Sequence, residues 1–257
     1  MAGRRRSMSE QRLHLRAGLR RVELRVRRDL LRFPRRVRCP ICGWTGPALA
    51  PSSKPRKPNR ICPRCGSSER YRAVELLLRR RGPVPPGTRL LEISPIGTIE
   101  PTATSLGYTY SSTNIDVRDA KVTAHAGLHA LPFPDHTFDL AVCLHVLEHI
   151  IDDSSALREL GRVLKPTGEA LVIVPWDPAR TVTFEDQSID PGQNAALYGQ
   201  HDHVRIYGAD VTTRWRDAGL VVEEQPWQEV FTPDVHKYAA LAGNDDRFWM
   251  VTRRPTI

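Results

Sequence analysis

The stretch from Phe133 to Trp176 constrains the fold of this chain more than any other. It contains two short apolar runs, 138–144 and 170–174, each long enough for a buried strand and too short for a helix. Between them, apolar residues recur at helical spacing over 156–164, which predicts a helix. A strand, a helix and a second strand in one sheet form a parallel crossover. The sequence therefore predicts an α/β fold with a parallel sheet.

Start and stop signals flank the predicted helix. Residues 152–155 (DDSS) supply an N-cap and negative charge, and Lys165-Pro166-Thr167-Gly168 is the predicted stop. Parallel sheets bind ligands outside the carboxyl ends of their strands. The segment 145–149 (HVLEH) directly follows the first strand and is rich in titratable groups. The chemistry of the chain is therefore expected there.

Two strings carry a resemblance to a known family. LPFPDHTFDLAVCLHVLEHI, followed by RVLKPTGEALVIVP, resembles the class I S-adenosylmethionine (SAM) dependent methyltransferases of the broad type 11-like branch. The resemblance implies SAM as cofactor and a Rossmann-like α/β sheet with helices on both faces. It is specific for the family and not for the substrate.

Length and composition predict one large domain with an appendage. A chain of 257 residues, 40% of them hydrophobic, can bury one core of about 180 residues and carry something smaller. We predict a basic N-terminal helix or arm at 1–38, a cysteine-rich module with a linking helix at 39–82, and a methyltransferase domain at 83–257. The methyltransferase domain is expected to carry a lid insert at about 176–209.

Four cysteines have the spacing of a metal site. Two CxxC pairs, each followed by glycine, place Cys39 and Cys42 on one tight turn and Cys62 and Cys65 on another. Such pairs predict a tetrahedral structural Zn²⁺ with no open position for a catalytic water. Disulfides or a redox pair are the alternatives. The phrase CPRCGSSERYR before a helix resembles the zinc-knuckle front end of one poorly characterised group of these methyltransferases. Cys143 is interpreted as a small core residue.

Charge is distributed unevenly along the chain. The net charge of +9 combines +11 over residues 1–38, which hold 14 arginines and three acidic residues, with +8 over 39–82 and −10 over 83–257. The basic front could bind RNA or an anionic surface, or dock on the acidic domain of the same chain. No run of 18 apolar residues predicts a membrane helix, and no secretory signal is recognisable. We expect a cytoplasmic protein with no membrane partner. The Arg-rich start leaves a transit peptide open, and the oligomeric state is not indicated.

The loop after the predicted strand 90–93 departs from the family pattern. The resemblance implies an acidic residue at the strand end, matched by Glu92, and then glycines that approach the cofactor. Here Ser94, Pro95 and Ile96 occupy that loop, and Gly97 is the remaining glycine. Glu92, Ser94 and Gly97 are therefore the predicted cofactor contacts.

Two further cofactor contacts are expected later in the chain. Asp116 ends the predicted strand 108–116, where a carboxylate can accept hydrogen bonds from both ribose hydroxyls. The alternative is a turn aspartate. Gly127 occupies the place of the family residue that contacts adenine, so that contact would fall to the Leu128 backbone, to His129 or to water.

Histidines dominate the candidate catalytic residues. His145 occupies the place that faces SAM in the family, and the set His145, Glu148 and His149 is similar to the metal-binding ExxEH cluster of ubiquinone-biosynthesis O-methyltransferases. The alternative is a structural cap without metal. In the lid, His203 is a candidate general base and Arg205 a candidate anion clamp, or both only attach the lid to the core.

The favoured prediction is a SAM-dependent methyltransferase. It would transfer a methyl group to a hydroxyl or amine of a small molecule such as a secondary metabolite or sugar, with His203, His145 and His149 as candidate bases. One alternative is an RNA methyltransferase that uses the zinc module and the arginine-rich front. Another is a SAM-fold binding protein without catalysis, because the cofactor loop and Gly127 depart from the family pattern.

Overall fold

The structure is a computed structural model and divides into two compact units, which we describe separately. The first unit comprises Met1–Pro86, Gly97–Tyr108 and Gln228–Gly243, and the second comprises Gly87–Ile96, Thr109–Trp227 and Asn244–Ile257. Described within them are residues 26, 36–52, 57–116, 118, 121–241 and 247–253. The predicted basic arm at 1–38 lies outside the described residues apart from residues 26 and 36–38.

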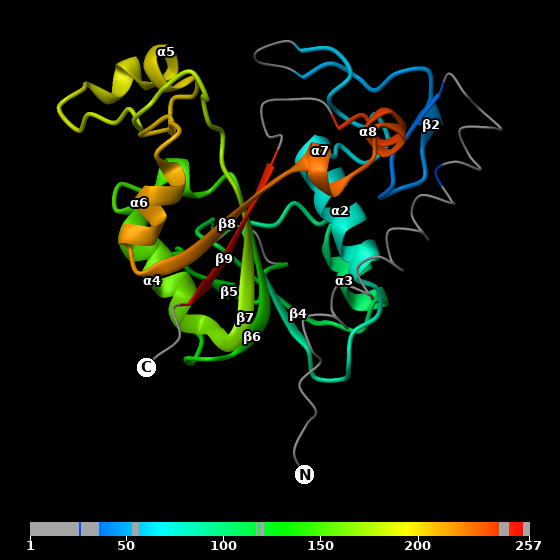
Figure 1. Ribbon diagram of the computed structural model, residues 1–257, viewed down its shortest axis with the longest axis horizontal. Helices are drawn as coiled ribbons and strands as arrows, with labels where there is room; N and C mark the ends of the chain where they lie inside the picture. Colours follow the sequence, from blue (N-terminus) through cyan, green and yellow to red (C-terminus); the bar gives the residue numbers. More distant parts are fainter. Residues whose placement is uncertain are drawn as a thin grey trace. The chain divides into compact units, whose positions relative to one another are not determined.

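A seven-stranded sheet forms the second unit, with the order β5-β4-β3-β6-β7-β9-β8 (Figure 1). Neighbouring strands from β5 to β7 run parallel, whereas β9 runs antiparallel to both β7 and β8. The strands are β3 (Arg89–Ile93), β4 (Thr109–Asn114), β5 (Ala124–His125), β6 (Phe138–Leu144), β7 (Leu164–Ile173), β8 (Leu220–Pro226) and β9 (Arg247–Arg253). The predicted Rossmann-like α/β sheet is confirmed.

The order of this sheet identifies a ligand-binding edge. After β3 the chain adds β4 and β5 on one side, and then returns to the other side of β3 with β6. In open parallel sheets such a reversal leaves a crevice beyond the carboxyl ends of the two central strands. The ends of β3 and β6 are therefore the place to look for a cofactor.

Strand β7 begins earlier than the sequence predicts. The segment from Lys165 to Gly168 is expected to be a turn, but it lies within β7, where the pairing with β6 shifts register between Phe138 and Leu140. A Cβ added at Gly168 would lie 2.6 Å from the Phe138 carbonyl oxygen. The glycine is thus required by the close approach of two strands.

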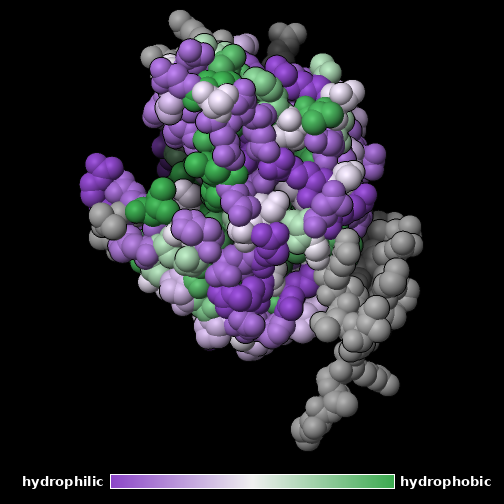
Figure 2. All heavy atoms as spheres, turned by 90° about the vertical axis from the view of Figure 1, so that its left-hand side faces the viewer, coloured by the Kyte–Doolittle hydropathy of each residue, from purple (hydrophilic) through white to green (hydrophobic). Residues whose placement is uncertain are grey.

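Helix α4 (Asp153–Val163) covers part of this sheet and packs on β7, β8 and β9. Its N-terminus is capped by Asp152, whose Oδ1 accepts a hydrogen bond from the Ser155 N–H at 2.9 Å. Its apolar residues are buried, in agreement with the helical spacing in the sequence. Helix α6 (Val211–Asp217) packs beside α4 and on β8. On the side where these helices lie in Figure 1, Figure 2 shows a mainly hydrophilic surface.

The burial of α4 gives a direct stability prediction. We expect Leu157→Ala to lower the free energy of unfolding by about 2–5 kcal/mol, because Leu157 is 0% exposed and its removal leaves a cavity. Urea denaturation followed by circular dichroism measures the change. Leu197→Ala is the matched control, since Leu197 is 36% exposed and should lose far less. Equal losses in the two variants would contradict the described packing.

The first unit combines a small hairpin with helices. Strands β1 (Val37–Arg38) and β2 (Thr45–Gly46) pair antiparallel. The helices are α2 (Glu69–Arg81), α3 (Glu100–Ser105), α7 (Trp227–Val230) and α8 (Pro233–Ala239). Helix α2 starts four residues before the predicted start at Ala73, and it ends as predicted before Gly82, whose φ is +75°. Within the described residues, no helix combines the length and the apolar character needed to cross a membrane.

Candidate functional site

The two CxxCG sequences fold into equivalent turns. In the first, the Gly43 N–H donates to the Cys39 carbonyl at 2.9 Å, and in the second the Gly66 N–H donates to the Cys62 carbonyl at the same distance. Both glycines have positive φ, +75° and +72°, which an L-residue adopts only with strain. The glycine after each pair is therefore part of the turn that orients its cysteines.

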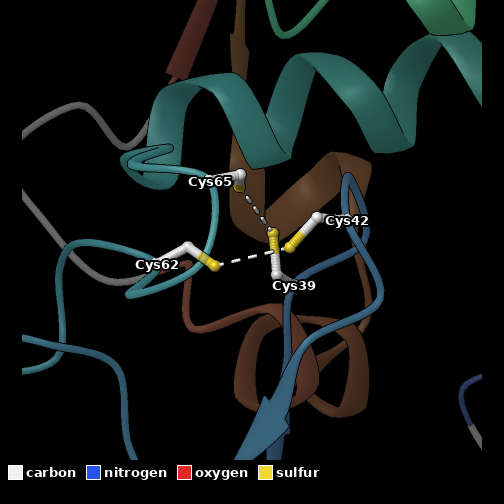
Figure 3. A group of neighbouring side chains, drawn as sticks. All are labelled: Cys39, Cys42, Cys62 and Cys65. Carbon is white, nitrogen blue, oxygen red and sulfur yellow. Dashed lines mark hydrogen bonds between the residues drawn. The ribbon is translucent and has the colours of Figure 1, made fainter.

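The four thiols of these turns meet at one point (Figure 3). Their sulfur atoms all lie within 4.8 Å of one another, with 3.7 Å between Cys39 and Cys65 and 3.6 Å between Cys42 and Cys62. A tetrahedral Zn²⁺ with bonds of about 2.3 Å requires sulfur separations of about 3.8 Å. None of the four is in a disulfide. The arrangement fits the predicted metal.

Electrostatics around these thiols differ from one cysteine to the next. Burial raises the pKa of Cys42 to about 12 and also raises the pKa of Cys39. Burial opposes ionisation of Cys65 as well, but hydrogen bonds with Ser67 outweigh it and lower its pKa to about 7. The cluster therefore contains one thiol, Cys65, that ionises readily, beside Cys39 and Cys42, whose ionisation a bound cation would favour.

A buried arginine lies next to the thiol cluster and was missed in the sequence. Arg72 is 0% exposed, and its guanidinium donates to four carbonyl oxygens. Two belong to the second knuckle region, Ser67 at 2.7 Å and Arg60 at 3.0 Å. The others are Ala239 at 2.7 Å and Ala240 at 3.0 Å, at the end of α8. Arg72 thus joins the knuckle to α8.

The ends of β3 and β6 share an unusual backbone conformation. Ser94 and His145, each the first residue after its strand, have φ of +54° and +55°. The Ser94 N–H still donates to the Thr113 carbonyl at 2.7 Å, and the His145 N–H to the Ile173 carbonyl at 2.8 Å. Positive φ in residues other than glycine is uncommon and collects at functional sites. Both residues were predicted to face the cofactor.

Other predicted cofactor contacts are spread over neighbouring elements. Glu92, in β3, is buried and accepts a 2.6 Å hydrogen bond from the Tyr110 hydroxyl of β4. Asp116 follows β4, and hydrogen bonds from Arg118 lower its pKa to about 2, so its carboxylate is ionised near neutral pH. The Leu128 side chain belongs to the core of the sheet. Gly97, with φ of +77°, lies in the first unit.

Three of the predicted catalytic histidines surround a buried carboxylate. Glu148 lies in η1 (Leu147–His149), and its Oε1 is 3.1 Å from His145 Nδ1. The rings of His149 and His203 meet edge to face with centroids 4.7 Å apart. Burial lowers the pKa of His203. The sequence groups Glu148 with His145 and His149. In the structure, His203 also lies close to Glu148 and His149.

Arg205 is also buried, and its guanidinium nitrogens bind protein groups. Its Nε donates to Glu185 at 2.7 Å, and its Nη atoms donate to the carbonyls of Leu147, Ile150 and Ile151. The predicted role of an anion clamp stays a prediction. In the structure these contacts attach the predicted lid to the loop after β6.

Asp153 is a second buried residue with a role that the sequence did not reveal. The sequence interpretation makes it part of a helix cap, but Asp152 makes the cap. Asp153 Oδ2 accepts from the Tyr207 hydroxyl at 2.7 Å, and both carboxylate oxygens accept from Arg214. These partners lie 54 and 61 positions along the chain, so no local pattern identifies them.

Comparison with known proteins supports one family for this part of the chain. Residues 99–172, which run from the loop after β3 into β7, match the family model of a methyltransferase domain. The match supports a class I SAM-dependent methyltransferase domain. This confirms the family inferred from the two strings around β6 and β7.

Relatives of the methyltransferase domain match over short stretches. A probable SAM-dependent methyltransferase of Mycolicibacterium smegmatis is 33% identical over 100 residues, which are 39% of this chain and 35% of that protein. A ubiquinone/menaquinone biosynthesis C-methyltransferase of Pasteurella multocida is 48% identical over 48 residues, 19% of this chain and 18% of the relative. The chain thus spans about a third or less of the length of these relatives.

A solved structure agrees with the fold of the methyltransferase domain. A chain from the complex of the Haloferax volcanii Trm112 methyltransferase activator with a methyltransferase has a TM-score of 0.50 and 16% identity. The alignment covers 74% of this chain and 91% of that one. At this identity the similarity supports the fold alone.

Proposed function

We propose that this protein transfers a methyl group from SAM to a hydroxyl or amine of a small molecule. The observation that carries the proposal is the pair of strained residues, Ser94 and His145, at the switch point of a sheet whose sequence matches a methyltransferase domain. Strain retained at two adjacent strand ends favours a binding site over a purely structural edge.

Residues at this edge fit the cofactor. Asp116 is ionised and would accept hydrogen bonds from the ribose hydroxyls, while Glu92, Ser94, His145 and the Leu128 backbone would complete the contacts. Bound SAM would supply an electrophilic methyl carbon on a sulfonium sulfur. The protein then has to align the acceptor in line with that carbon and to exclude water.

His145 is our preferred base among the predicted histidines. Its Nδ1 lies 3.1 Å from Glu148 Oε1, so the carboxylate can orient the ring and stabilise the imidazolium formed when Nε2 takes a proton from the acceptor. Its position at the end of β6 supports this role. Arg205, whose nitrogen atoms bind protein groups, is better suited to holding the loop than to contacting substrate.

A small acceptor fits the surroundings of the lid. A cavity of about 240 Å³ is lined by Ile151 and by residues of the predicted lid such as Tyr198 and Val204. Pockets for small molecules combine apolar walls with polar groups that fix orientation, and the polar groups here are Glu185, Asp186, Gln187, Asn194 and Arg205. RNA as the acceptor would depend on the arginine-rich residues 1–38, which lie almost entirely outside the described residues.

The four cysteines are proposed to hold a structural zinc ion. Thiol spacing close to that of a tetrahedral Zn²⁺ supports this, and four thiolates leave no position for a catalytic water. The ion would act by stabilising the fold of the first unit.

Isothermal titration calorimetry with SAM tests the proposal. We expect saturable binding at micromolar concentrations, and Asp116→Ala should weaken it by about 10-fold to 100-fold, because hydrogen bonds to a charged group contribute about 1.5–3 kcal/mol. Asp135→Ala is the control, since Asp135 is paired with Arg162 and is not among the proposed contacts. Absent or millimolar binding by the wild type would exclude the proposed activity.

Methyl transfer from labelled SAM then tests the acceptor class. Label appearing in hydroxyl-bearing or amine-bearing small molecules is the expected result. Label appearing only in RNA, with strong dependence on salt concentration, would replace the small-molecule proposal with the RNA alternative.

A further inference from the structure

We propose that Glu148, His149 and His203 form a second metal site, selective for a divalent transition metal. One ligand atom from each of the three residues lies within 4.8 Å of the others. Glu148 and His149 come from η1, and His203 comes from the predicted lid. The site is separate in chemistry from the thiol cluster, because its donors are two imidazole nitrogens and a carboxylate. Its metal binding does not depend on the proposed methyl transfer.

The carboxylate of Glu148 is the first reason for this assignment. Glu148 is 0% exposed, and in the described part of the chain the only donors near its carboxylate are His145 Nδ1, close to Oε1, and its own backbone N–H. Buried carboxylates normally receive several hydrogen bonds or pair with a cation, since desolvation of the charge is otherwise costly. A metal ion would supply the charge that these oxygens lack.

Hydrogen bonds fix which nitrogen of each imidazole can bind a metal. His203 Nδ1 lies 3.1 Å from the Tyr198 carbonyl, and His149 Nδ1 lies 3.1 Å from the Asp202 carbonyl. A carbonyl can only accept, so each Nδ1 carries the proton and each Nε2 keeps its lone pair. His203 is 5% exposed, and its Nε2 has no partner among the described residues. Metal-ligating histidines are commonly held by such a bond from the other ring nitrogen.

Neighbouring contacts hold the three ligands in register. The Val204 N–H donates to the Glu148 carbonyl at 2.9 Å, which places His203 beside η1. Arg205 donates to the carbonyls of Leu147 and Ile151 at 2.7 Å, on either side of the two η1 ligands. Because these bonds are made by protein alone, the ligands are positioned before any ion binds.

The donor set defines the class of metal. Two imidazoles and one carboxylate suit Zn²⁺, Fe²⁺, Co²⁺ or Mn²⁺, whereas Mg²⁺ and Ca²⁺ prefer sites made of oxygen atoms. Metal bonds of about 2.0–2.2 Å require somewhat shorter separations between ligands, which small side-chain rotations provide. Three protein ligands leave at least one position for water or another oxygen ligand. This assignment gives His149 and His203 to the metal and leaves His145 as the base.

Zinc content of the full-length protein tests this site. After equilibration with Zn²⁺ and removal of the unbound ion, we expect two equivalents in the wild type, one at the four cysteines and one here. Glu148→Gln and His203→Gln should each retain one equivalent, with zinc affinity at this site weakened by about 100-fold or more. His201→Gln is the matched control, because His201 belongs to the same loop as His203 but its side chain is 88% exposed and is not one of the three ligands.

Folding of each variant is checked by circular dichroism, and zinc-dependent thermal stabilisation gives a second readout. Zinc should raise the Tm of the wild type and of His201→Gln after the cysteine site is full, and it should no longer do so in Glu148→Gln. If His203→Gln does not fold, Glu148→Gln decides the question. One equivalent in the wild type, or two in a folded Glu148→Gln variant, would overturn the proposal.

Discussion

Cys62→Ser is expected to remove one equivalent of zinc and to unfold much of the first unit. Cys62 supplies one of four sulfur atoms that lie within 4.8 Å of one another, and its backbone forms the second knuckle. Structural zinc contributes about 10–16 kcal/mol in small zinc-binding peptides, so loss of one ligand removes a large share of the stability of such a module. Metal analysis measures the zinc, and limited proteolysis with circular dichroism measures the unfolding.

Cys143→Ala provides the matched control for this experiment. Cys143 is fully buried in β6, and burial raises the pKa of its thiol, so it stays protonated and has no role in the cluster. This variant should keep the zinc of the cysteine site. Undiminished zinc in Cys62→Ser would rule out the four-cysteine site.

Arg72→Met is expected to lower the stability of the first unit by about 3–5 kcal/mol, because each buried carbonyl oxygen left without a donor costs about 1–3 kcal/mol. The change would leave carbonyl oxygens of Ser67, Arg60, Ala239 and Ala240 without their donor. Methionine fills a similar volume but donates no hydrogen bond. Urea denaturation measures the loss in the free energy of unfolding, and limited proteolysis at each urea concentration shows which of the two units has unfolded.

Arg64→Met is the control for Arg72→Met. Arg64 lies between Cys62 and Cys65, but it is exposed and makes a long 3.4 Å contact with the Cys42 carbonyl. Its replacement should change stability by no more than about 0.5 kcal/mol. A loss as small as this in Arg72→Met would show that the buried network contributes little.

The central strands were predictable because their signal is local. Strand β6 is a run of mostly buried apolar residues, as expected for a parallel strand covered on both faces, and its bounds match the predicted 138–144. The predicted start of β7 was wrong, because a sequence that resembles a turn is held in the sheet by the approach of Gly168 to Phe138. This close contact depends on both strands, so the sequence of neither strand alone indicates it.

The buried polar residues could not be predicted in the same way. The sequence singles out Glu148 and His203 for separate reasons, but they are 55 positions apart, and nothing in either segment indicates that they meet. The partners of Arg72 at Ala239 and Ala240 are even more distant. Such contacts form only in the complete fold. The sequence therefore indicates which residue types a site uses, but it does not indicate which residues come together to form it.

The assembly of the first unit from three segments affects how the chain can fold during synthesis. The two knuckles, both complete by Gly66, can bind metal early. The carbonyl oxygens of Ala239 and Ala240, however, lie 167 and 168 positions after Arg72, so they become available to it late. Contacts between such distant segments form slowly, because a long loop must close first. Until α8 has been synthesised, the Arg72 guanidinium would remain hydrated. The two knuckles could bind metal by then, but the first unit would complete its packing only after α8 is added.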